Sequence, residues 1–76
     1  MNLQDIGSRI YYLRTEVLNL PQRDFAQRMG IAQSHISKVE KGMSLPGCYF
    51  MAGLYKSYQI NINWLLSGEG ELHIHS

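Results

Sequence analysis

Apolar residues recur at helical spacing in the first part of the chain. Ile6, Ile10, Leu13 and Val17 are separated by four, three and four positions, which places them on one stripe of a helix. This stripe predicts a core helix that follows a short leader over residues 1–5. The two arginines of this segment lie off the stripe or at its edge, so a solvated position is the simplest expectation for each.

Two shorter helical segments follow. Gln22–Met29 is about two turns long, and Gly30 stands where a left-handed residue ends a helix at low cost. Gln33–Lys41 then restarts the helical period, with Ile36 and Val39 on one face and polar residues on the other. This pattern predicts a helix-turn-helix in which the second helix packs with one face and exposes the other.

Two further helices are predicted in the second half of the chain. One opens at Pro46 and Gly47 and runs to about Tyr58, and a short fifth helix covers residues 61–66. The inward-facing residues of these helices are expected to be Phe50, Leu54, Ile62 and Leu65 or Leu66. An all-α fold is therefore expected.

A length of 76 residues is that of one small domain, which buries only about 60% of its unfolded surface. We expect this domain to span residues 1–76, with a core at about 6–70 and a flexible tail at 71–76. No separate ligand-sensing or peptidase module is expected in this chain. Regulation would then depend on oligomerisation, concentration or a partner.

The formal net charge is only +1, but the charges are unevenly placed. From Arg9 to Lys41 the chain carries six basic and three acidic residues. The predicted helix-turn-helix therefore lies in the positive part of the molecule. The near-neutral total predicts few phosphate contacts per subunit and a modest non-specific affinity for nucleic acid.

Other function classes find little support. Cys48 is the single cysteine, and neither a signal peptide nor an apolar run of membrane-spanning length is found, so we expect a cytoplasmic setting and a partly buried Cys48. His73 and His75 could hold a metal only with ligands from elsewhere, so we expect no metal and no cofactor. We expect no enzyme, because no helix-borne metal pair, paired nucleophile and base, or glycine-rich phosphate loop is present.

The run LPQRDFAQRMGIAQSHISKVEKG over residues 20–42 closely resembles the DNA-binding domains of Cro and lambda-type phage repressors. The resemblance continues through Leu45-Pro46 and through WLLSGEG at residues 64–70, so it covers about 6–70. It implies a five-helix lambda repressor-like domain of the Cro/C1-type (XRE) family, with the helix-turn-helix as helices two and three. It also implies a bacterial or phage-encoded protein that binds double-stranded DNA at the nucleoid.

The resemblance assigns base reading to the start of the third helix. Gln33 matches a base-reading glutamine, whose amide can pair with N6 and N7 of adenine. Ser34, Ser37 and Lys38 lie on the same exposed face, and Lys38 could donate to O6 and N7 of guanine. Ala32 stands where relatives carry a capping serine or threonine, and its methyl group could meet a thymine methyl group.

The resemblance also implies residues that contact the DNA backbone or fix the position of the reading helix. Gln22 matches a glutamine that contacts a phosphate and supports the first glutamine of the reading helix. Arg14 matches an arginine that pairs with the counterpart of Glu40, which predicts a bridge between helices one and three. The remaining phosphate candidates are Arg23, His35, Lys41 and Ser44. Solvent exposure without a DNA contact is the alternative for Arg23 and His35.

Besides Ala32, the chain departs from its relatives at three places. One extra residue lies between Glu16 and Asn19, and Asn19 replaces a frequent glycine, although asparagine tolerates the left-handed conformation. Pro21 cannot cap the second helix with a side chain. Gly47-Cys48-Tyr49 replaces a typical helix start, so the fourth helix should begin weakly.

In relatives the last helix commonly forms a dimer contact. The exposed parts of Trp64, Leu65 and Leu66, with Tyr55 and Tyr58, are therefore the dimer candidates. The preferred hypothesis is a homodimeric repressor of a near-palindromic operator. The alternative is an antitoxin-like protein-interaction module with secondary DNA autoregulation, which a large exposed apolar patch would favour. Relatives often continue into a linker and second domain, so the sequence leaves open whether the chain is part of a longer repressor.

Overall fold

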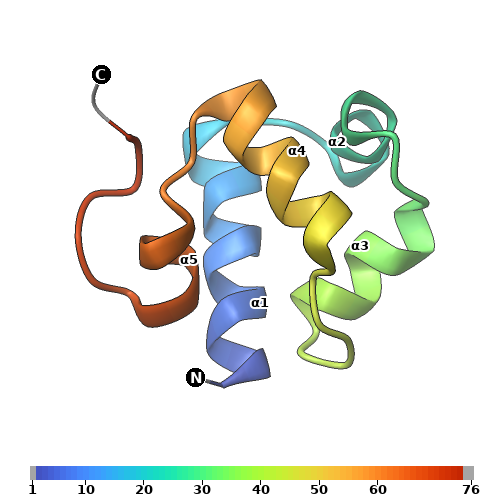
Figure 1. The fold of residues 1–76 in the computed structure, drawn as a ribbon. Coiled ribbons are helices and arrows are strands. Elements are labelled where there is room, and N and C mark those ends of the chain that lie inside the picture. Colours follow the sequence, from blue (N-terminus) through green and yellow to red (C-terminus); the bar gives the residue numbers. More distant parts are fainter. Residues whose placement is uncertain (1, 75–76) are drawn as a thin grey trace.

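A computed structural model describes residues 2–74, which form five α-helices and one π-helical turn. The elements are α1 (Leu3–Tyr12), η1 (Leu13–Val17), α2 (Gln22–Met29), α3 (Gln33–Glu40), α4 (Cys48–Tyr58) and α5 (Ile62–Ser67). Within these residues no strand forms, and Ile60 and His73 make an isolated antiparallel bridge. The expected all-α fold with α2 and α3 as the helix-turn-helix is confirmed (Figure 1).

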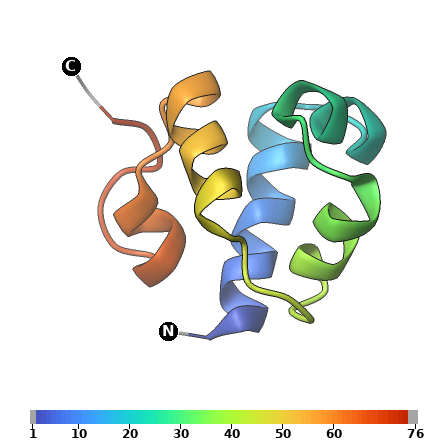
Figure 2. The same ribbon diagram turned by 45° about the vertical axis from the view of Figure 1, so that its right-hand side comes forward.

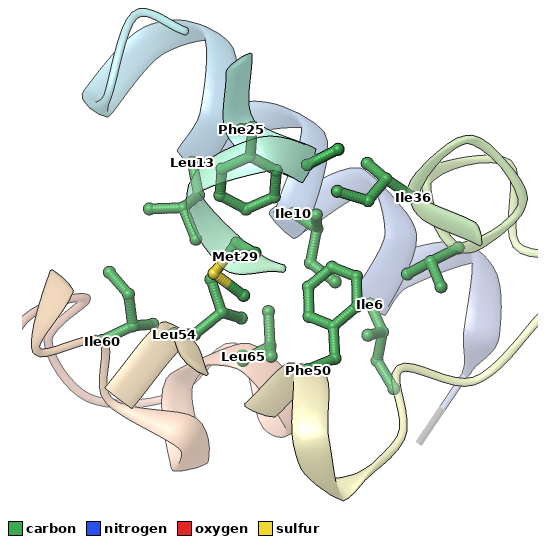
Figure 3. Packing of buried hydrophobic residues seen from close by; sticks show 12 residues of the cluster. Ile6, Ile10, Leu13, Phe25, Met29, Ile36, Phe50, Leu54, Ile60 and Leu65 are labelled. Atoms are coloured by element: carbon green, nitrogen blue, oxygen red, sulfur yellow. The ribbon is translucent and has the colours of Figure 1, made fainter. Parts of the chain in front are cut away.

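Helix α1 runs through the middle of the molecule, with α5 on one side and α3 on the other (Figure 1). Ile6, Ile10 and Leu13 of the predicted stripe are fully buried, and Val17 is partly buried against them. Side chains from every helix meet in one cluster around this stripe (Figure 3). The buried apolar residues are Ile6, Ile10, Leu13, Phe25, Ala26, Met29, Ile36, Val39, Phe50, Leu54, Ile60 and Leu65.

The expected leader is wrong for Leu3–Asp5, which form the first turn of α1. Asn2 caps this turn, because its side-chain oxygen accepts a hydrogen bond of 2.8 Å from the backbone N–H of Gln4. Asp5 in the first turn also suits the positive end of the helix dipole. Met1 lies outside the described residues.

The turn after α1 is wider than an α-helical turn. The N–H of Leu18 donates to the carbonyl of Leu13, five residues earlier, at 2.9 Å. A π-helical turn holds one residue more than the α-helical turn it replaces. Such a turn has room for the extra residue that the resemblance implies between Glu16 and Asn19. Asn19 follows with a φ of 58°, the left-handed conformation expected there.

Helix α2 has the predicted bounds, and α3 starts at the predicted Gln33 but ends at Glu40, one residue before the predicted end. Gly30 ends α2 with a φ of 66°, and Ala32 precedes α3 without a side-chain hydrogen bond. Gly7 allows α1 to approach the end of α3 directly, since a Cβ atom at Gly7 would lie 2.3 Å from the carbonyl oxygen of Val39. The backbone contact between α1 and α3 therefore helps to set the position of α3.

The chain after α5 folds back onto the domain, so the expected flexible tail is wrong for residues 71–74. The N–H of Asn61 donates to the carbonyl of Leu72 at 2.7 Å, and the N–H of Ile74 donates to that of Gln59 at 2.8 Å. Leu72 packs against the core beside the fully buried Ile60. His75 and Ser76 lie outside the described residues.

Helix α4 begins at Cys48, and Gly47 provides no side-chain cap, as expected for this atypical start. Cys48 is exposed, so the prediction of a partly buried thiol is wrong. The reason is its place in the first turn of α4, on the side away from the buried Phe50 and Leu54.

Candidate nucleic-acid interface

Helix α3 presents a polar face to solvent. Ile36 and Val39 are fully buried and fasten the opposite face to the core. Gln33, Ser34 and Lys38 are exposed, and Ser37 is half-buried. The four predicted base readers therefore lie on one helix that is held from behind by apolar packing.

The last residue of α3 is tied to the first part of the chain by a buried ion pair. The guanidinium of Arg14 faces the carboxylate of Glu40 with two bonds, Nε to Oε2 at 2.6 Å and Nη2 to Oε1 at 3.0 Å. Its Nη1 donates to the carbonyl of Leu20 at 3.0 Å, and its carbon lies 5.3 Å from the ring centre of Tyr11. The bridge implied by the resemblance is present and holds the end of α3 against η1.

A chain of amides extends from this carboxylate to the reading face. Nε2 of Gln22 donates to Oε1 of Glu40 at 3.1 Å, and Nε2 of Gln33 donates to Oε1 of Gln22 at 3.3 Å. The carboxylate paired with Arg14 only accepts hydrogen bonds, so Gln22 must turn its NH₂ group toward Glu40 and its oxygen toward Gln33. Gln33 is then oriented, with its own oxygen and one N–H still available.

The free groups of Gln33 match one base. Adenine presents N7 as an acceptor and the N6 amino group as a donor in the major groove. The remaining N–H of Gln33 can donate to N7 while its oxygen accepts from N6. The direction of the Glu40–Gln22–Gln33 chain leaves one donor and the acceptor of this amide available for such a contact.

Basic and polar side chains surround the reading face. Arg23 and Lys41 are exposed, and Ser44 is half-buried in the loop after α3. Arg23 lies 4.0 Å from Asp24, but its side chain is 85% exposed, so this pair leaves the guanidinium accessible. His35 is half-buried with its ring centre 6.0 Å from that of Phe50, which turns the imidazole toward α4. A phosphate contact by His35 stays a prediction.

A family model described as helix-turn-helix matches residues 10–47, which is half of the chain. The chain belongs to the Cro/C1-type helix-turn-helix family. The matched residues run from the last turn of α1 through α3 and the loop that follows it, and they include every residue expected to contact DNA. No curated protein and no solved structure matched the chain. This protein is a DNA-binding helix-turn-helix regulator.

Some dimer candidates of this helix-turn-helix protein pack into the core, and others keep exposed surface. Leu65 is fully buried and carries no exposed surface, so its place among the dimer contacts is wrong. The ring of Tyr58 stacks on that of Phe25 at 6.1 Å, and its hydroxyl is buried without a hydrogen-bond partner among residues 2–74. Trp64 and Leu66 are half-buried and keep exposed surface beside α1.

Two positioning residues were not predicted. Arg9 donates from Nη1 to the carbonyl of Leu65 at 3.0 Å and joins α1 to the end of α5. Gly68 makes room for this contact, because a Cβ atom there would lie 2.8 Å from Nη2 of Arg9. Gly7, the second of the two, allows α1 to contact α3. Neither role has a local signal in the sequence, since each partner lies far along the chain.

The described part of the chain offers neither a metal site nor a membrane-spanning helix. No group of three or more histidine, cysteine or acidic side chains there is placed to hold a metal ion. Between residues 2 and 74, every helix is too short or too polar to cross a membrane.

Proposed function

We propose that this protein is a transcriptional repressor that binds a near-palindromic operator as a homodimer. The observation that carries the proposal is the directed amide chain from Glu40 through Gln22 to Gln33. A surface glutamine without such support would lose rotamer freedom on binding. Preorganisation of Gln33 reduces that entropic cost and favours one base over the others.

Each base-reading role follows from exposure and chemistry. Gln33 pairs with adenine through N6 and N7, and Lys38, about one turn later, donates to guanine. Ser34 and Ser37 lie between them on the same face and make adaptable hydrogen bonds to bases or phosphates. The four side chains together define a short half-site.

Backbone contacts hold α3 in the groove. The phosphate-binding residues in this proposal are Gln22, Arg23, His35, Lys41 and Ser44. Gln22 has a second Nε2 hydrogen for a phosphate after its bond to Glu40. These few contacts per subunit are consistent with the net charge of +1 and require a second subunit for tight binding.

The dimer in this proposal uses Trp64 and Leu66 of α5, with Tyr55 of α4, which is 53% exposed. Two copies would place their reading helices in successive major grooves, about 34 Å apart. Occupancy of a promoter by such a dimer excludes polymerase without any effector domain. The proposed location is the nucleoid of a bacterium.

Selection of bound duplexes from a random pool, followed by sequencing, tests the proposal. The expected result is a two-fold symmetric motif with adenine at the position that Gln33 contacts. The same selection with Gln33→Ala is the control and should lose the preference at that position alone. An absence of any enriched motif at matched salt would contradict operator binding, and a single asymmetric half-site would contradict the dimer.

A protein-interaction module is the second candidate. Tyr49 and Tyr55 of α4 are 70% and 53% exposed, and Tyr55 lines a surface hollow with Lys56, Gln59 and Ile74. Exposed aromatic side chains can serve as contacts with another protein where they belong to a larger apolar patch. A stable complex with another protein, together with a failed duplex selection, would favour this candidate over the repressor.

A further inference from the structure

The loop that follows α3 has a defined geometry. The N–H of Gly42 donates to the carbonyl of Val39 at 3.0 Å, and the N–H of Met43 donates to that of Lys38 at 2.8 Å. Gly42 has a φ of 76°. This pair of bonds around a left-handed glycine is the Schellman ending of a helix. It fixes Met43 directly beyond the end of the reading helix, next to Lys38.

Two apolar side chains of this loop have no place in the core. Met43 is 68% exposed and Leu45 is 58% exposed. In a Schellman ending the residue at the position of Met43 usually packs on an apolar residue one turn earlier. The residues available here are Ser37 and Lys38, so Met43 finds no apolar partner in its own helix.

The loop cannot withdraw these side chains by moving inward. A Cβ atom at Gly42 would lie 3.0 Å from the Cα atom of Gln4, so the loop backbone already touches the first turn of α1. At the other end Pro46 is buried. The loop protrudes at the same end of the molecule as the start of α1 (Figures 1 and 2). Met43 and Leu45 are therefore held outward in the free protein.

We propose that Met43 and Leu45 form an apolar contact with the deoxyribose groups of the DNA backbone beside the base pair that Lys38 reads. This inference rests on the proposed function. The DNA backbone alternates charged phosphates with apolar sugar faces, and the loop alternates Lys41 and Ser44 with Met43 and Leu45. Lys41 and Ser44 hold phosphates, and the two apolar side chains cover the sugars between them.

The charge of the protein supports an apolar contribution. Phosphate contacts release counterions and weaken with salt, and this chain has a net charge of only +1. Burial of Met43 and Leu45 against sugars adds affinity that salt does not remove.

The test compares binding of the wild type and of the double variant Met43→Ser/Leu45→Ser to the selected operator over a range of salt. The expected result is a loss of about tenfold in affinity, or about 1.4 kcal/mol, with an unchanged salt slope. Hydroxyl-radical footprinting should show that sugars beside the base pair read by Lys38 lose protection. Lys41→Ala, from the same loop, should instead reduce the salt slope by about one unit.

The swap variant Met43→Leu/Leu45→Met keeps both apolar side chains and should bind like the wild type. Unchanged affinity and footprint in the double serine variant would overturn the sugar contact. Weaker self-association of that variant without DNA, measured by sedimentation equilibrium, would overturn it in favour of a contact with a second copy. A wild type that selects no operator would overturn the proposed function itself, and the sugar contact with it.

Discussion

The helix-turn-helix and the segment from α4 to Ile74 are held in different ways. Around α3 a directed series of polar groups, from Arg14 through Glu40 and Gln22, reaches Gln33 at the surface. In the later segment Tyr58 stacks on the core but leaves its hydroxyl unpaired within the described chain. Hydrogen bonds fix the orientation of a side chain, whereas apolar packing mainly fixes its position. In the proposed function base reading by Gln33 needs orientation, and the polar network leads to this residue.

The largest expected effect is loss of the buried ion pair. Arg14→Met would leave the carboxylate of Glu40 without its guanidinium, and removal of one member of a buried pair costs about 3–5 kcal/mol of unfolding free energy. Urea denaturation measures this loss. Arg23→Met is the matched control, because Arg23 and Asp24 are exposed and their pair contributes little. A small change in unfolding free energy for Arg14→Met would show that the polar network does not stabilise the helix-turn-helix.

The next largest loss of stability is expected from a substitution at Gly7, where the backbones of α1 and α3 come close together. Gly7→Ala would place a Cβ atom 2.3 Å from the carbonyl oxygen of Val39 and 2.9 Å from that of Glu40. Both atoms belong to the backbone, so the helices must separate, at an expected cost of about 3 kcal/mol in unfolding free energy. Gly47→Ala is the control, since nothing lies within 4 Å of the added atom. Equal stability of the two variants would contradict the close backbone contact.

A binding experiment distinguishes sequence-specific recognition by Gln33 from non-specific attraction of DNA by Lys41. Gln33→Ala should weaken operator binding by about 1–3 kcal/mol and leave binding to random DNA unchanged. Lys41→Ala should weaken both and reduce the salt slope by about one unit. Titrations on the two duplexes at several salt concentrations measure these effects. Equal losses on both duplexes for Gln33→Ala would remove Gln33 from the base readers.

The smallest effect is expected for a substitution at Tyr58, which should stabilise the protein and not destabilise it. Its buried hydroxyl has no hydrogen-bond partner among the described residues, and such a group destabilises the folded state. Tyr58→Phe keeps the stacked ring and should raise the unfolding free energy by about 1 kcal/mol. Tyr55→Phe is the control, because Tyr55 is 53% exposed, and it should leave the unfolding free energy unchanged. A loss of stability in Tyr58→Phe would indicate a partner for the hydroxyl, such as a bound water molecule.

Features that depend on neighbouring residues could be predicted from the sequence. The bounds of α2, the left-handed Gly30 and the left-handed Asn19 were expected from short-range rules. The Arg14–Glu40 pair joins residues 26 positions apart and was expected only because the chain resembles a known family. Leu65 was expected either to face the core or to contribute an exposed part to the dimer, and only the core position is right. A six-residue helix has too short a pattern to show which face packs inward.

Features that depend on distant partners were decided by the tertiary structure. The tail was expected to be flexible, yet residues 72–74 pair with residues 59–61, and their own sequence contains no strong strand pattern. Arg9 contacts a carbonyl 56 positions away, and Gly7 is required by the backbone of α3. The sequence alone determined the helices, the turn and the polar face of α3, because helical period and turn chemistry act over a few residues. Only the folded chain decided how that face is oriented, because orientation depends on contacts between segments that meet after folding.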